Sequence, residues 1–506
     1  MSVFALAGVA AEAAGGGMPR REESGFAQLQ GDRWDPGSLR PKASAPANGG
    51  VSLRGLSIGE SGGLGVRTTR LVTRWLGPFY GFGYLGVAVV AQVVMMWVTY
   101  FYSPPPEAGL TIYVPISLVG WAMVIGRMVD AIADPLVAVW SDNTTSRWGR
   151  RIPFILFGAP PLILSFIFLW KPPVAEISWF NFLYLALVLS AFFFFFTVVV
   201  APYLALLPEI ARGVRQRVNL AAWQAFFNII GLAIAMVGSA LLVERFGFFT
   251  MGLVIGLVAL ISYWIPALTV AERRPEGRTT GIGFWQSIVL TLRNRPFIFY
   301  ILSQICFWFG FNMVMITAAY FVTVVMGLGE GQVGLTLGLT MLVAMISFPL
   351  ITLLARKKGT KSAMLFTTAL FVVILAALAS FGRWPLPISP ALQGFILFGA
   401  AGVPLAGLFV LPNAIVAELT DYDQAITGQR REAIYYGMQG LAVKAAMGLS
   451  SLGVSLLLNT FGYSQSRPLG ILLSGPVAAF FTLVGFVIFL AYPLGKADVG
   501  EDQVRK

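Results

Sequence analysis

The sequence predicts an all-α membrane protein in which twelve spanning helices form two pseudo-symmetric six-helix halves. Three observations support this prediction: the composition, the recurrence of long apolar stretches, and the uneven distribution of basic residues among the loops. Of the 506 residues, 57% are hydrophobic and only 11% are charged, and the mean hydropathy is +0.77. A soluble protein this apolar would be hard to keep in solution. Apolar windows of about 20 residues are typical of membrane-spanning helices.

The apolar stretches divide the chain into a regular series of elements. We expect spanning helices at 77–102, 112–140, 153–170, 180–207, 218–243, 248–270, 297–326, 333–355, 363–381, 391–417, 434–459 and 468–492. The N-terminal half is then 75–270 and the C-terminal half is 297–492, joined by a basic cytoplasmic linker at 271–296. Residues 1–74 are rich in Gly, Ala, Pro and Ser without sustained periodicity, which predicts a disordered cytoplasmic tail. Residues 493–506 form a second cytoplasmic tail.

The basic residues of the chain predict its orientation in the membrane. Of the 35 Lys and Arg residues, twenty fall on one side of the predicted spans and only four on the other, at Lys171, Arg245, Arg383 and Arg467. Basic residues are enriched on the cytoplasmic side of membrane proteins. We therefore expect a multi-pass protein of the cytoplasmic (plasma) membrane with both termini in the cytoplasm. The net charge of +12 reflects this asymmetry, and we expect no nucleic-acid partner.

The inventory of reactive side chains excludes several functional classes. The only cysteine, Cys306, lies in an apolar span, so no intrachain disulfide can form, and the chain contains no histidine. A proton pathway would have to use carboxylates, lysine, tyrosine or water. No nucleophile–base pair, phosphate-binding loop or metal-ligand cluster appears. We expect no enzymatic activity, no cofactor, and no metal other than a coupling Na⁺.

The second span contains three charges, Arg127, Asp130 and Asp134, inside an otherwise apolar run. A charge at the centre of a bilayer costs roughly 2.5–3.5 kcal/mol on insertion scales, so such residues usually have a partner or a function. Asp130 and Asp134 are four residues apart and share one face of a helix, and Arg127 lies one turn back on the same side. We expect Arg127 to neutralise the negative charge of Asp130.

Position along a span indicates depth, because an α-helix rises 1.5 Å per residue. Asp130, Lys444 and Thr197 each lie ten residues from the predicted cytoplasmic end of the second, eleventh and fourth spans, or roughly 15 Å into a core of about 30 Å. We therefore expect them to meet near the midplane, with Asp134 on the cytoplasmic side of Asp130. Two carboxylates and one ammonium predict a site where H⁺ or Na⁺ replaces lysine. The alternative is a set of ion pairs that only fixes helix packing.

Two further groups of polar residues are candidates for function. Carboxamides of spans five and seven predict either a substrate cavity or interhelical hydrogen bonds, at Gln224, Asn228, Gln304 and Asn312. Charged residues at matching cytoplasmic ends of the two halves predict either a salt-bridge latch that closes an inner gate or solvated loops, at Glu209, Arg212, Arg215, Glu418, Asp421 and Arg431.

The two halves repeat each other at an offset of about 210 residues. Trp148–Arg151 follows the second span and Lys358–Lys361 follows the eighth, while Pro202–Glu209 ends the fourth and Pro412–Glu418 ends the tenth. Two six-span halves in parallel arrangement, joined by a basic linker, resemble the architecture of the major facilitator superfamily.

A finer resemblance is to one family of that superfamily, the glycoside–pentoside–hexuronide:cation symporters, which are melibiose permease-like. The matching residues are Tyr80–Gly83, Arg127, Asp130, Asp134, Pro135, Ser141, Asp142, Ser146–Arg151, Pro153, Pro202, Tyr203, Leu206, Pro208, Glu209, Asp421, Tyr422, Arg431, Glu432, Gln439 and Lys444. The resemblance covers about 80–500. It implies that Asp130, Asp134, Thr197 and Lys444 serve cation binding or its coupling.

Three positions depart from the family pattern where the resemblance implies a substrate cavity. The two acids that bind galactosides fall at Ala88 and Val200, and the tryptophan that flanks the sugar falls at Leu204. A melibiose-like binding mode is therefore not expected. Loss of the acid at Val200 also leaves fewer oxygen ligands for Na⁺, which favours H⁺ coupling.

These observations leave three functions open. The first is a secondary active transporter that couples H⁺ or Na⁺ to symport of a sugar or glycoside by alternating access. The second is a symporter of the same mechanism that carries a lysolipid or another amphiphile, as animal relatives of the family do with Na⁺. The third is a transporter-like sensor that does not translocate its ligand. We expect a monomer in the lipid bilayer with a small-molecule substrate, a sugar or glycoside in preference to an amphiphile.

Overall fold

The computed structural model of the protein describes residues 63–211, 214–270, 291–292, 294–382, 388–427 and 432–493. Most of the predicted tail 1–74, most of the linker 271–296 and most of the tail 493–506 lie outside the described residues. The described residues from 76 onward belong to one compact unit, and those from 63 to 75 belong to another. All contacts reported below lie within the first of these units.

The described part of the N-terminal half is helical, with short connections. Its elements are α2 (Gly63–Tyr102), η1 (Pro106–Ala108), α3 (Ile116–Asn143), α4 (Ile152–Phe168), α5 (Trp179–Ile210), α6 (Val214–Ala233), η2 (Ile234–Gly238) and α7 (Ser239–Thr269). The first of these is helical from Gly63, so it extends into the region where we predicted a disordered tail. Extending an existing helix is far less costly than nucleating one, and the apolar span supplies the nucleus.

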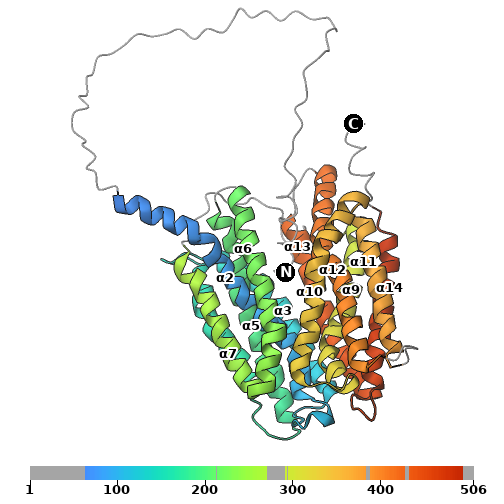
Figure 1. Cartoon of the computed structure of the whole chain (residues 1–506). Helices are drawn as coiled ribbons and strands as arrows, with labels where there is room; N and C mark the ends of the chain where they lie inside the picture. Colours follow the sequence, from blue (N-terminus) through green and yellow to red (C-terminus); the bar gives the residue numbers. More distant parts are fainter. Residues whose placement is uncertain are drawn as a thin grey trace, which may run out of the picture. The chain divides into compact units, whose positions relative to one another are not determined.

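The C-terminal half has the same character. Its elements are α9 (Arg295–Tyr320), η3 (Phe321–Val325), α10 (Glu330–Lys358), α11 (Thr360–Ala377), η4 (Leu378–Ser380), α12 (Pro390–Thr427), α13 (Glu432–Phe461) and α14 (Leu469–Leu490). In Figure 1, α2, α5, α6 and α7 gather on one side of the bundle, and α9 to α14 gather on the other.

Ten helical stretches in the described residues are long and apolar enough to cross a membrane. One of them, Asn219–Thr269, has 51 residues and contains two predicted spans. The two spans are separated at Gly247, where a positive φ of 78° interrupts the helix. Glycine adopts this conformation readily, whereas a residue with a side chain does not. The apolar helix α4 is shorter, with 17 residues. Each of the twelve predicted spans therefore coincides with a helical stretch.

Helix α3, which carries the intramembrane charges, packs against α5 of its own half and α13 of the other half. Small residues permit the second contact: a Cβ added at Gly120 would lie 2.7 Å from the Cβ of Ser455. Similarly, a Cβ at Gly334 of α10 would lie 2.9 Å from the carbonyl oxygen of Met236 in η2. Close approach at small residues is a common way to pack helices in a membrane. It places α3 and α13 where their side chains can bond.

Hydrogen bonds join the two halves at the ends of helices that we predict to face outward. The Tyr320 hydroxyl of α9 lies 2.9 Å from the carbonyl oxygen of Thr99 and 2.7 Å from that of Ser103. Its ring packs edge-on against Tyr100, with centroids 5.2 Å apart, and the Tyr100 hydroxyl lies 3.4 Å from Glu330 Oε1 of α10. All of these tyrosines are fully buried. The predicted outer ends of the halves are thus in direct contact.

Candidate functional site

Four polar side chains from three helices meet inside the bundle. Lys444 Nζ of α13 lies 2.9 Å from Oδ1 of Asp130 and 2.7 Å from Oδ2 of Asp134, both on α3. The Thr197 hydroxyl of α5 donates to the same Asp130 oxygen over 2.8 Å and lies 3.4 Å from Asp134 Oδ1. The structure thus brings together the four residues that depth and resemblance selected. We call them the ion cluster.

The charged members of the ion cluster differ in exposure. The Asp130 side chain is only 2% exposed, that of Lys444 is 13% exposed, and that of Asp134 is 30% exposed. The most exposed of the three, Asp134, is also the one nearer the predicted cytoplasmic end of α3.

Arg127 completes the charge balance. Its Nη1 lies 3.2 Å from Asp130 Oδ2, its Nη2 lies 2.9 Å from the Met95 sulfur, and its guanidinium carbon lies 4.2 Å from the centre of the Phe193 ring. Two carboxylates and two cations sum to zero, which lowers the cost of burying them. The aromatic face and the thioether hold Arg127 on the far side of Asp130 from Lys444, so it supports the carboxylate without blocking the cluster.

The four candidate carboxamides separate into two groups. Gln224 Nε2 donates to the Tyr80 hydroxyl over 2.8 Å, and Asn312 Nδ2 donates to the Met447 carbonyl oxygen over 3.2 Å. These are interhelical bonds, α6 to α2 and α9 to α13. Asn228 Oδ1 and both polar atoms of the Gln304 side chain are buried without a hydrogen-bond partner among the described residues. Gln304 is fully buried, so its two free polar atoms are costly in the ligand-free protein.

The three positions that depart from the family pattern lie in packed surroundings. Ala88 and Val200 are buried, and Leu204 packs against the main core. Ala88 meets α6 closely, since a Cβ added at Gly231 would lie 2.8 Å from the Ala88 Cβ. They offer no hydrogen-bonding side chain, so a polar substrate would have to be recognised elsewhere.

The charged residues of the suggested inner gate bond within their own halves where the structure describes them. Glu209 Oε1 lies 2.5 Å from Arg150 Nη2 and 2.6 Å from Arg151 Nε, all in the N-terminal half. Glu418 accepts from the Thr360 hydroxyl over 2.7 Å in the C-terminal half. The remaining members of the set are either exposed or beyond the described side chains: Asp421 is exposed, Arg212 and Arg431 lie outside the described residues, and so does the side chain of Arg215. A latch between the halves remains a prediction.

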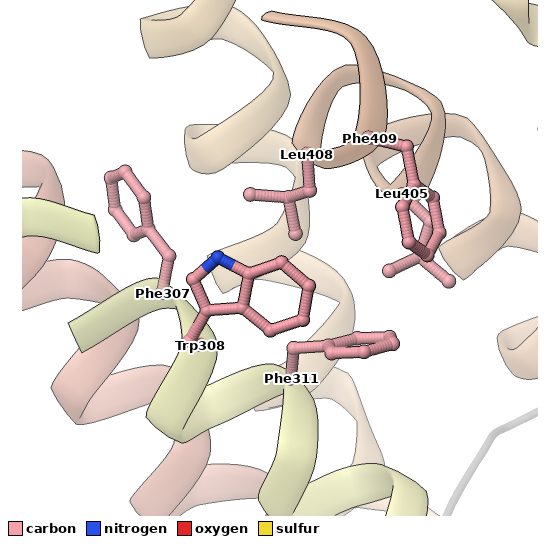
Figure 2. A pocket seen from close by; sticks show the side chains of 6 residues that line it. All are labelled: Phe307, Trp308, Phe311, Leu405, Leu408 and Phe409. Carbon is pink, nitrogen blue, oxygen red and sulfur yellow. The ribbon is translucent and has the colours of Figure 1, made fainter. Parts of the chain in front are cut away.

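A small apolar gap lies between α9 and α12, and it holds no space large enough for a water molecule. We call it the aromatic pocket, and its lining residues are Phe307, Trp308, Phe311, Leu405, Leu408 and Phe409. Figure 2 shows the Trp308 indole reaching from α9 towards the leucines of α12. Sequence reasoning missed this pocket, because aromatic residues spaced along an apolar span are indistinguishable from ordinary core residues. The spacing of 307, 308 and 311 on one helical face was the only available signal.

The comparisons with known proteins agree with this fold. Residues 79–496 match the family model described as MFS/sugar transport protein. An uncharacterized symporter of Synechocystis sp. is 25% identical, with 83% of this chain and 94% of that protein aligned. The isoprimeverose transporter of Lactiplantibacillus pentosus is 23% identical, over 69% of this chain and 73% of that protein.

Two further matches extend this picture. The sodium-dependent lysophosphatidylcholine symporter 1-A of Danio rerio is 24% identical, over 73% of this chain and 77% of that protein. Among solved structures, a variant of the nucleoside transporter NupG superposes with a TM-score of 0.61 at 11% identity, over 82% of this chain and 98% of that one. With a family model that matches most of its length, this chain belongs to the MFS/sugar transport protein family and is a multi-pass secondary transporter of the major facilitator fold.

Proposed function

We propose that this protein is a symporter that couples H⁺ or Na⁺ to the transport of a sugar or glycoside by alternating access. The observation that carries the proposal is the position of Lys444. It bonds to Asp130 and Asp134 of the opposite half and thereby acts as an internal counter-ion where a cation would bind. Intramembrane ionisable residues mark ion pathways more often than they serve packing alone.

The geometry suggests how binding and movement are coupled. A cation that neutralises the carboxylates of Asp130 and Asp134 removes the attraction that holds Lys444 between them. Because α3 and α13 belong to different halves, loss of this attraction frees the halves to move relative to each other. Alternating access in such carriers is largely a rocking of one half against the other around a central site. The carboxylates thus couple the binding of the ion to the side of the membrane that the site faces.

H⁺ is the favoured coupling ion. The hard oxygen atoms within the cluster belong to Asp130, Asp134 and Thr197, and Val200 stands where the family has another acid. Na⁺ would have to draw its coordination from this small set, whereas a proton needs only one carboxylate.

A second candidate substrate is a lysolipid or another amphiphile. Similarity to a sodium-dependent lysophosphatidylcholine symporter supports it. A third candidate, a sensor that does not translocate its ligand, is less consistent with a complete ion cluster, because burying these charges is costly.

The test is uptake by purified protein in proteoliposomes under an imposed H⁺ or Na⁺ gradient, over a panel of sugars, glycosides and lysophospholipids. Gradient-driven accumulation of a glycoside supports the proposal. Binding of the same glycoside without accumulation under either gradient would instead support the sensor.

A further inference from the structure

The loop between α3 and α4 turns two of its arginines back onto the protein. Gly149 has a positive φ of 107°, a conformation that favours glycine, and it turns the chain at this point. Directly after the turn, Arg150 and Arg151 both bond to Glu209. Arg151 Nη2 also lies 2.9 Å from Asp142 Oδ1. These two arginines thus face two carboxylates of the protein, which balance their charge.

Arg147, two residues before the turn, is placed differently. It is exposed, and among the described residues no carboxylate forms an ion pair with it. Its guanidinium carbon lies 4.7 Å from the centre of the Trp148 ring. An aromatic face attracts a cation but does not use up its five N–H donors. The loop therefore presents one positive charge that no described carboxylate balances.

Exposed aromatic side chains lie at the same end of α3 and α4. Trp148 packs against Phe157 of α4, with ring centres 5.7 Å apart, and Trp140 of α3 packs edge-on against Phe154 of α4 at 5.4 Å. Trp140 is 59% exposed and Phe157 is 61% exposed. Tryptophan is enriched where a membrane protein crosses the headgroup region of the bilayer. We call Arg147 and these four aromatic residues the aromatic–basic surface.

The C-terminal half repeats the turn but not the surface. Gly359, 210 residues after Gly149, also has a positive φ, of 90°. Lys358 is exposed and stands where the first half has Trp148. Among the described residues, no aromatic ring lies against its ammonium group. The aromatic–basic surface is therefore particular to α3 and α4, and Lys358 offers a matched control.

We propose that the aromatic–basic surface binds an anionic phospholipid of the predicted cytoplasmic leaflet. The Arg147 guanidinium donates to the lipid phosphate, an acceptor that suits its planar set of N–H groups. The exposed rings pack against the glycerol and the upper part of the acyl chains. The charges are complementary, because the cytoplasmic leaflet carries a negative potential that attracts basic residues at its surface. This binding is independent of the transported substrate and of the coupling ion.

The first experiment measures lipid preference by native mass spectrometry of the full-length protein in detergent. The protein is titrated with dioleoylphosphatidylglycerol and, separately, with dioleoylphosphatidylcholine, which has the same acyl chains but no net charge. We expect the wild type to bind the phosphatidylglycerol more tightly. Arg147→Gln should weaken phosphatidylglycerol binding about fivefold, since a basic residue near an anionic surface contributes ~1 kcal/mol, and should leave phosphatidylcholine binding unchanged. Arg147→Lys keeps the charge and should keep most of the preference.

The second experiment compares variants at the two turns. Lys358→Gln removes the same charge at the equivalent position of the other half and should keep the wild-type preference. Trp148→Leu removes the ring that holds Arg147 in place and should weaken phosphatidylglycerol binding less than Arg147→Gln does. All of these variants should melt at the wild-type temperature in phosphatidylcholine nanodiscs, because none removes an ion pair between described residues.

Three outcomes overturn the proposal. The first is the same lipid preference in Arg147→Gln as in the wild type. The second is equal weakening by Arg147→Gln and Lys358→Gln, because the preference would then come from the overall positive charge of this end of the bundle. The third is displacement of the bound lipid by excess glycerol 3-phosphate, which carries the phosphate without acyl chains and would identify a site for soluble phosphate instead.

Discussion

Lys444 donates a hydrogen bond of 2.7 Å to Asp134 across 310 positions of sequence and between the two halves of the fold. This bond joins α3 of one half to α13 of the other. The predictions below follow from it and from its surroundings.

Asp130→Asn should abolish gradient-driven accumulation while the protein still folds and inserts into the membrane. The amide has no negative charge to attract a cation and cannot take up a proton, but it keeps the size of the side chain, and Asp134 still pairs with Lys444. Uptake and counterflow in proteoliposomes check this. Glu176→Gln, in an exposed loop, is the matched control and should behave as the wild type. Accumulation that survives Asp130→Asn contradicts the coupling role.

Lys444→Ala should uncouple transport and lower stability, because it leaves two carboxylates opposite Arg127 alone. Removing one partner of a buried ion pair typically costs about 3–5 kcal/mol. Adding Asp134→Asn restores a neutral cluster, so the double variant should melt at a higher temperature than Lys444→Ala. Thermal unfolding of both single variants and the double variant forms the thermodynamic cycle. Additive losses would show that Lys444 and Asp134 do not interact energetically.

Replacing K⁺ by Na⁺ at constant pH and ionic strength should leave the melting temperature of the wild type unchanged. A ligand that binds only the folded state stabilises it by mass action, so a coupling Na⁺ would raise the melting temperature with concentration. Under H⁺ coupling, a pH gradient drives uptake in the absence of Na⁺. A Na⁺-dependent increase that disappears in Asp130→Asn would identify Na⁺ as the coupling ion instead.

Tyr320→Phe should weaken the closure of the predicted outer ends. The change leaves the carbonyl oxygens of Thr99 and Ser103 without this buried donor, a loss of about 1–3 kcal/mol. Spin labels at Leu110→Cys and Ser466→Cys, with Cys306→Ser, should then show longer distances in electron paramagnetic resonance.

The matched control for Tyr320→Phe is Tyr184→Phe. The Tyr184 hydroxyl donates to the Phe168 carbonyl oxygen within one half, so its loss should not change the distance between the labels. Identical distance distributions for Tyr320→Phe and the wild type would mean that these hydrogen bonds do not hold the halves together.

The sequence predicted which residues form the ion cluster but not the bonds between them. Helical rise places Asp130, Thr197 and Lys444 at one level, because rise per residue is nearly constant. Which way each helix is rotated depends on packing against other helices. Glu209 shows the difference: its charge suggested a latch between the halves, yet it bonds to Arg150 and Arg151 of its own half.

The aromatic pocket was not predictable for a related reason. Phe307, Trp308 and Phe311 have the composition of a packed helix face, and a small gap between two helices leaves no trace in either sequence. In the sequence, Gln304 and Asn413 look like ordinary residues for hydrogen bonds between helices. Only the structure shows that their side-chain polar atoms are buried without a partner among the described residues.

The amino-acid sequence by itself determined that this protein is a twelve-span membrane carrier with charges at mid-depth, because hydropathy, basic residues and helical rise are local properties. Only the tertiary structure decided which atoms of the ion cluster bond to each other, which charges pair within their own half and which carboxamides remain unsatisfied. These depend on the rotation and contact of helices separated by hundreds of residues, and no local pattern specifies them.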